Sequence, residues 1–286
     1  MLYTALIMRG LLKMTATNTM VLSERHAGTE SFESPPFGDR VKSMLKLDFY
    51  RLFTTPAFYI MLVIAAIIPA MVLSMAGADM QTSDGVAQST MVITNAWQMI
   101  ESTGGSAVAD NPLDFSGFAN INMLYIFAGL LMSIFVAHDY SSGFVKNIFT
   151  VHSKKTDYVI SKSVVGVFGG AGMIVAYVIG TVLAGLITGK AFDVDVAGLI
   201  MCLVSKVFLM GVFCSLFLGI AVFFRSKLWL TIVFTFMLGM MLYPAASVAT
   251  LSSTVITLLL TLVAGIAGAV GLGTVSSVIL RKRDLA

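Results

Sequence analysis

The stretch that decides the fold is LWLTIVFTFMLGMMLYPAASVATLSSTVITLLLTLVAGIAGAVGLGTVSSVIL, from Leu228 to Leu280. It contains no charged residue. As a helix it would reach roughly 80 Å, which is enough to cross the hydrocarbon core of a bilayer twice, at about 30 Å per crossing. Pro244 and the polar run 247–253 mark the place where the chain would turn. We therefore predict two membrane-spanning helices, Trp229–Tyr243 and Thr254–Leu280.

The rest of the chain has the same apolar character. Of its 286 residues, 57% are hydrophobic and only 12% are charged, and the mean hydropathy is +0.91. Soluble domains carry about 25% charged residues, so this composition excludes a soluble enzyme. Four more apolar runs are long enough to span a membrane: Phe58–Met75, Phe118–Ala137, Ser163–Thr188 and Gly198–Phe224. The expected fold class is an all-α integral membrane protein with six transmembrane helices.

The segments ahead of the first span differ from each other. Residues 1–40 are expected to form a flexible cytoplasmic tail, because residues 14–40 are polar after the short apolar stretch Met1–Met8, and its true start is either Met1 or Met14. In Val41–Phe53 apolar residues recur at helical spacing, with Lys42 and Lys46 on the other side. This pattern predicts an amphipathic helix at the membrane interface, although a plain juxtamembrane helix fits as well. Residues 41–286 then form one transmembrane domain.

The basic residues give the orientation. Of the 18 Lys and Arg residues, sixteen fall on one side of the predicted topology. The predicted outer loop, residues 78–117, has none. Because Lys and Arg are retained in the cytoplasm, we expect both termini to be cytoplasmic, in a cell membrane.

The spans lack the residues that membrane-embedded chemistry needs. None of them contains Asp, Glu or His, and the chain has no phosphate-binding loop. Cys202 and Cys214 lie within one apolar run and have no metal or redox spacing. We therefore predict no catalytic residue, no metal ligand and no cofactor bound by this chain, and nothing in the sequence indicates a nucleic-acid partner.

Lys206 is the one ionisable residue inside a predicted span that stands near the middle of the hydrocarbon core. Its long side chain can extend toward the membrane surface, or it can line a polar cavity. In the second interpretation Lys206 belongs to a transport pathway.

The predicted cytoplasmic loop 138–162 carries a second amphipathic pattern. Phe144, Val145, Ile148 and Phe149 alternate with polar residues at helical spacing. A short helix on the water side favours docking to a partner protein, and the alternative is a helix that lies on the lipid surface.

At this loop the chain resembles the membrane subunits of type-2 ABC exporters, in particular the branch that exports peptides or confers bacteriocin immunity. Asp139-Tyr-Ser-Ser-Gly143 is similar to the family's acidic-x-x-x-Gly pattern ahead of the coupling helix, with Asp139 in place of Glu and Phe144 in place of Thr. The amphipathic segment before the first span, the large outer loop and the short inner loop Arg225-Ser226-Lys227 add to the likeness. Together these features cover residues 41–283.

The resemblance implies a bacterial transporter in which two permease subunits pair, as a homodimer or heterodimer, above two ABC ATPase subunits that bind ATP and Mg. Membrane lipid surrounds the helices. The residues that would couple the permease to the ATPase are Asp139, Gly143, Val145, Lys146, Asn147, Phe149, Arg225 and Lys227. This chain would itself not be an enzyme, because ATP hydrolysis would take place in the separate subunit.

The substrate expected from the resemblance is an amphipathic or antimicrobial peptide, or a similar hydrophobic compound. The outer loop has acidic residues and no basic ones, which would attract a cationic peptide, although exclusion of Lys and Arg gives the same composition by default. The same architecture could export a lipid-linked glycan or a drug. A membrane scaffold or sensor that transports nothing is a further alternative.

Overall fold

The computed structural model describes residues 36–75, 93–100, 120–150, 154–224, 227–246, 248–251 and 253–282. These residues form helices and no strand; one isolated bridge joins Asn95 to Ala191. The predicted tail therefore lies almost wholly outside the described residues, as do Arg225 and most of the predicted outer loop.

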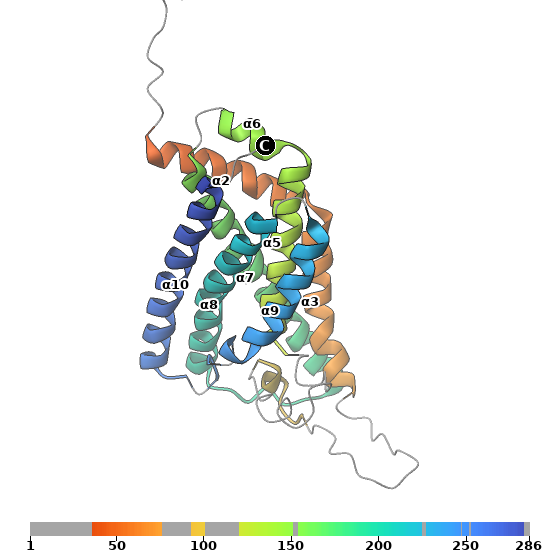
Figure 1. Ribbon diagram of the computed structural model, residues 1–286. Coiled ribbons are helices and arrows are strands. Elements are labelled where there is room, and N and C mark those ends of the chain that lie inside the picture. The colour runs from red at the N-terminus through yellow and green to blue at the C-terminus, as the bar shows by residue number, and fades with distance from the viewer. Residues whose placement is uncertain are drawn as a thin grey trace, which may run out of the picture. The chain divides into compact units, whose positions relative to one another are not determined.

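The helices, in chain order, are α2 (Phe37–Thr54), α3 (Pro56–Met75), the short 3₁₀ helix η1 (Ala96–Met99), α5 (Met123–Ser141), α6 (Phe144–Thr150), α7 (Lys155–Thr188), α8 (Val196–Phe224), α9 (Leu228–Ala246) and α10 (Val255–Lys282). Figure 1 shows the long helices side by side, with α2 lying across one end of the bundle and α6 beside it. We call this end the α6 end.

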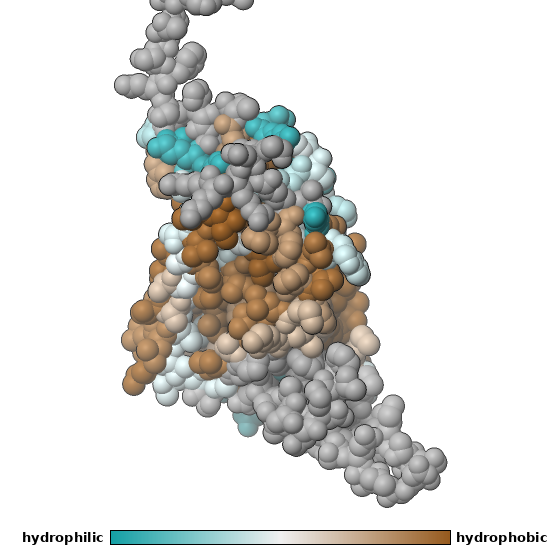
Figure 2. Space-filling model, viewed as in Figure 1, coloured by the Kyte–Doolittle hydropathy of each residue, from teal (hydrophilic) through white to brown (hydrophobic). Residues whose placement is uncertain are grey.

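Among the described residues, five helices are long and apolar enough to cross a membrane: α3, α5, α7, α8 and α10. The apolar part of α9, Leu228–Leu242, is shorter. An all-helical protein with several such helices agrees with the predicted class, while the sixth crossing and the cytoplasmic termini stay predictions. On the face seen in Figure 2, hydrophobic residues predominate along the middle of the bundle, and hydrophilic ones gather at the α6 end.

Two helices extend beyond the spans that hydropathy predicted. Helix α5 continues through Ser141, and α7 begins at Lys155, so both reach into the predicted loop 138–162. With 34 residues, α7 is roughly 51 Å long, well beyond the ~30 Å of a hydrocarbon core. Helical backbone therefore carries polar residues of both helices to the α6 end in fixed positions.

Local sequence explains the corner between α2 and α3. Asp39 in the first turn of α2 and Arg51 in the last complement the helix dipole. Pro56 occupies the first position of α3, where its missing N–H is not needed. The Tyr59 hydroxyl donates a hydrogen bond of 2.8 Å to the Phe53 carbonyl and fixes the corner.

The opposite end of the bundle is closed by part of the predicted outer loop. Ile93, Ala96, Met99 and Ile100 are all buried in the main hydrophobic core. The Tyr177 hydroxyl of α7 donates a hydrogen bond of 3.2 Å to the Met99 carbonyl. The segment 93–100 is thus packed into the bundle rather than lying free above it.

Close packing of α3 on α7 depends on one glycine. A Cβ at Gly180 would overlap the backbone carbonyl of Ala66 in α3. Backbone cannot move aside as a flexible side chain can, so only glycine permits this approach.

We predict that Gly180→Ala lowers the unfolding temperature of the detergent-purified protein, with a loss of about 1–3 kcal/mol for overpacking. The matched control is Gly271→Ala in α10, where an added Cβ meets nothing within 4 Å. This control should unfold at the wild-type temperature or slightly above it, since Ala favours helix. Equal unfolding temperatures for the two variants would contradict the close α3–α7 contact.

Candidate functional site: a buried charge cluster at the α6 end

Four charged side chains from three helices meet inside the α6 end. They are Asp48 and Arg51 of α2, Asp139 of α5 and Lys162 of α7, and we call them the buried charge cluster. The side chains of Asp48, Asp139 and Lys162 have no exposed surface, and that of Arg51 is 17% exposed. Two carboxylates face two cations, so the formal charge of the cluster is zero.

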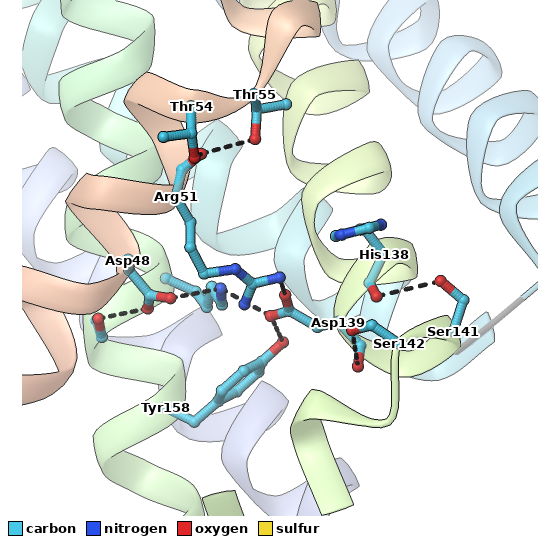
Figure 3. Close-up of polar contacts among 11 residues, drawn as sticks. Asp48, Arg51, Thr54, Thr55, His138, Asp139, Ser141, Ser142 and Tyr158 are labelled. Atoms are coloured by element: carbon cyan, nitrogen blue, oxygen red, sulfur yellow. Dashed lines mark hydrogen bonds and ion pairs between the residues drawn. The ribbon is translucent and has the colours of Figure 1, made fainter. Parts of the chain in front are cut away.

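Lys162 bridges the two carboxylates. Its Nζ lies 2.7 Å from Asp48 Oδ1 and 2.7 Å from Asp139 Oδ2. Arg51 pairs with Asp139 Oδ1 from the other side. Figure 3 shows Asp139 between Arg51 and Tyr158, with Asp48 on the neighbouring helix.

Neutral donors also bind the two carboxylates. The Tyr158 hydroxyl donates to Asp139 Oδ2 at 2.9 Å. The Ser161 hydroxyl donates to Asp48 Oδ2 at 2.6 Å. Removing charges from water is costly, and these ion pairs and hydrogen bonds offset part of the cost.

Aromatic rings cover the two cations. Lys162 Nζ lies 3.8 Å from the ring centroid of Phe135, and Arg51 Cζ lies 4.0 Å from that of Phe144. A cation over a ring face is attracted by the ring quadrupole. Since Phe144 is the first residue of α6, this contact ties α6 to α2.

A second ion pair lies toward the start of α2. Arg40 Nε is 2.9 Å from Asp157 Oδ2, at the beginning of α7. Asp48, Asp139 and Asp157 are the three acidic residues of the predicted inner segments between residues 41 and 280, and all three are buried. Each is paired with a cation, so these three acids join the helices and do not neutralise the lysines that are exposed.

Several of the residues predicted to couple the permease to an ATPase come together here, in different settings. Asp139 and Val145 are buried, whereas Lys146 and Asn147 are exposed on α6. The Phe149 ring packs against Tyr158, with centroids 5.9 Å apart. Lys227 is exposed at the start of α9, and Arg225 lies outside the described residues.

Gly143 forms the turn between α5 and α6. Its φ of +72° is in the left-handed region, which L-residues with a side chain avoid. The turn follows four residues after Asp139, which is anchored in the charge cluster. The spacing from Asp139 to Gly143 thus has a physical reason. Asp139 fixes the end of α5, and the turn at Gly143 then sets the direction in which α6 leaves it.

Lys206 lies apart from this cluster, within α8. Its side chain is fully buried, and its Nζ donates a hydrogen bond of 2.9 Å to Asn122 Oδ1, just before α5. The Tyr125 hydroxyl donates to the Lys206 carbonyl at 3.2 Å. Lys206 therefore connects α8 to α5 in this conformation, and its place in a transport pathway stays a prediction.

Sequence reasoning missed Asp48, Arg51, Tyr158 and Lys162 as a site. The sequence places Asp48 and Arg51 in one predicted segment and Tyr158 and Lys162 in another, and Arg51 and Lys162 were used only to assign the orientation. One signal in the sequence could have indicated the site. The predicted inner segments between residues 41 and 280 contain only three acidic residues among many basic ones, so each aspartate is a candidate for an ion pair. No family model, curated protein or solved structure matches this chain.

We predict that Lys162→Met destabilises the protein by about 3–5 kcal/mol, because it leaves a net buried negative charge. Adding Asp48→Asn to Lys162→Met makes the cluster neutral again and should recover part of the loss. Thermal unfolding of the two variants in detergent measures the difference. A double variant no more stable than Lys162→Met would contradict the ion-pair account, and Lys146→Met, at an exposed lysine, serves as the control.

A separate prediction concerns the turn at Gly143. A Cβ there would meet nothing within 4 Å, so any effect of Gly143→Ala comes from the backbone conformation alone. We expect a loss of roughly 1–2 kcal/mol for Gly143→Ala and a smaller loss for Gly143→Asn, since Asn tolerates this region better. The same unfolding assay compares them, and an equal or larger loss for Gly143→Asn would contradict the interpretation.

Proposed function

We propose that this chain is the permease subunit of an ATP-driven ABC exporter that moves an amphipathic or antimicrobial peptide out of the cell. In this proposal α6 is the helix that docks on a separate ATPase subunit. Two permease chains and two ATPase subunits form the transporter. ATP and Mg bind to the ATPase subunits.

The observation that carries the proposal is the way in which α6 is held. A helix that receives force from a partner needs an outer face free for contact and a firm connection to the helices that it moves. Lys146 and Asn147 of α6 are exposed, while Val145 is 1% exposed. Phe144 contacts Arg51 and Phe149 contacts Tyr158. Both Arg51 and Tyr158 bind Asp139 of the buried charge cluster.

This arrangement supports transmission of movement from α6 to the bundle. Asp139 stands at the end of α5, and Lys162 near the start of α7. A displacement of α6 would act on α5 through the short turn at Gly143, and on α2 and α7 through the cluster. Because no proposed span carries an ionisable pair for ion coupling, energy from a partner is consistent with the sequence.

We predict that Lys146→Glu reduces the recovery of the ATPase subunit with the tagged chain several-fold, because it reverses the charge of the proposed docking face. The measurement is gentle purification from the native membrane followed by quantitative mass spectrometry. Lys190→Glu, which makes the same charge change at the opposite end of α7, is the matched control. Equal recovery with both variants, or no ATPase with the wild-type chain, would contradict the proposal.

A further inference from the structure

A groove runs between α7 and α10 near the α6 end. It has a volume of about 330 Å³, and one of its walls is formed by α8 at Ser215. Its α7 residues extend from Thr156 to Val164 and its α10 residues from Ala269 to Ser277. At 1.5 Å per residue the groove is therefore about 12 Å long and lies along both helix axes.

The groove is apolar and open along its side. Its rim residues Ile160, Val164 and Val270 are 38%, 44% and 61% exposed. In a membrane this opening would face lipid. The long axis of the groove would then run parallel to the hydrocarbon chains of one leaflet. The shape fits one extended acyl chain better than a compact solute.

Two hydroxyls in the wall lack partners. Ser163 Oγ and Ser215 Oγ are buried and make no hydrogen bond to any residue that the structure describes. Ser215 is completely buried, and serines within helices ordinarily bond to a carbonyl one turn earlier. A mostly apolar cavity with a few unsatisfied polar groups is typical of a ligand site.

Positive charge marks the end of the groove at the α6 end. Lys155 precedes Thr156, and its Nζ donates a hydrogen bond of 2.9 Å to the Leu280 carbonyl of α10. An ammonium group has three donors, so two remain. Lys154 is exposed beside it, and the neighbouring Asp157 is already paired with Arg40.

We infer that this groove binds an anionic phospholipid, with an acyl chain between α7 and α10 and the phosphate at Lys154 and Lys155. Basic pockets between transmembrane helices at the inner surface are known to select anionic headgroups. This inference requires a membrane protein but not the transport function, so either proposal can fail alone.

The test uses the full chain in detergent and phosphatidylglycerol as the probe, with phosphatidylcholine for comparison. Native mass spectrometry gives the bound lipid, and the lipid-induced rise in unfolding temperature gives a second readout. Wild-type protein should bind phosphatidylglycerol in preference. Equal binding of the two lipids would overturn the proposed headgroup site.

Two α10 variants separate the groove from general contact with lipid. At Gly273 an added Cβ would lie 4.0 Å from Val159, so Gly273→Leu fills the groove. Gly271→Leu makes the same change where nothing lies within 4 Å. We expect Gly273→Leu to lose the bound phosphatidylglycerol and Gly271→Leu to keep it; equal retention by both would overturn the inference.

A charge variant tests the headgroup end without changing the groove. Lys154→Gln with Lys155→Gln should weaken phosphatidylglycerol binding at least about five-fold and leave phosphatidylcholine binding unchanged. Lys227→Gln, at an exposed lysine outside the groove, is the control. An unchanged preference for phosphatidylglycerol in the double variant would overturn the assignment of the phosphate to these lysines.

Discussion

Lys162 holds two carboxylates from different helices at 2.7 Å each, and the arrangement of the α6 end depends on this contact. One carboxylate belongs to α2 and the other to α5, so a single ammonium group on α7 joins three helices. Arg51 makes the cluster neutral, and rings of Phe135 and Phe144 shield the cations. A buried cluster of this kind contributes less to net stability than to specificity, because its members have no other acceptable partners in an apolar environment.

Burial of Asp48 and Asp139 in the cluster, and of Asp157 in its separate ion pair with Arg40, also determines which charges remain at the surface. Since Asp48, Asp139 and Asp157 are buried and paired with cations, they do not neutralise the exposed lysines. Lys42, Lys46, Lys146 and Lys154 are exposed. The buried acids thus join the helices through ion pairs. The exposed lysines form a basic surface that would attract an anionic membrane or an acidic partner.

Much of the fold could be predicted from the sequence, because long apolar runs and helical spacing are strong signals. The helix at Phe144–Thr150 matches the amphipathic pattern found there, and the bounds of α8 and α10 lie within two residues of the predicted spans. The start of α7 and the end of α5 were not predicted. Polar residues occupy both of these helical stretches, so hydropathy alone does not include them in a span. The charge cluster was also missed, because pairing of Asp48 with Lys162 depends on tertiary contacts that no local pattern encodes.

Asp48 and Arg51 attach α2 to α5 and α7 through the charge cluster, so α2 should open only together with the bundle. Hydrogen–deuterium exchange of the purified wild-type protein tests this expectation most directly, because it reports local opening of each helix. If the account is correct, amides of α2 around Asp48 exchange about as slowly as those of α7 around Lys162. Exchange of α2 that is orders of magnitude faster, as for a helix lying loosely on a surface, would contradict it.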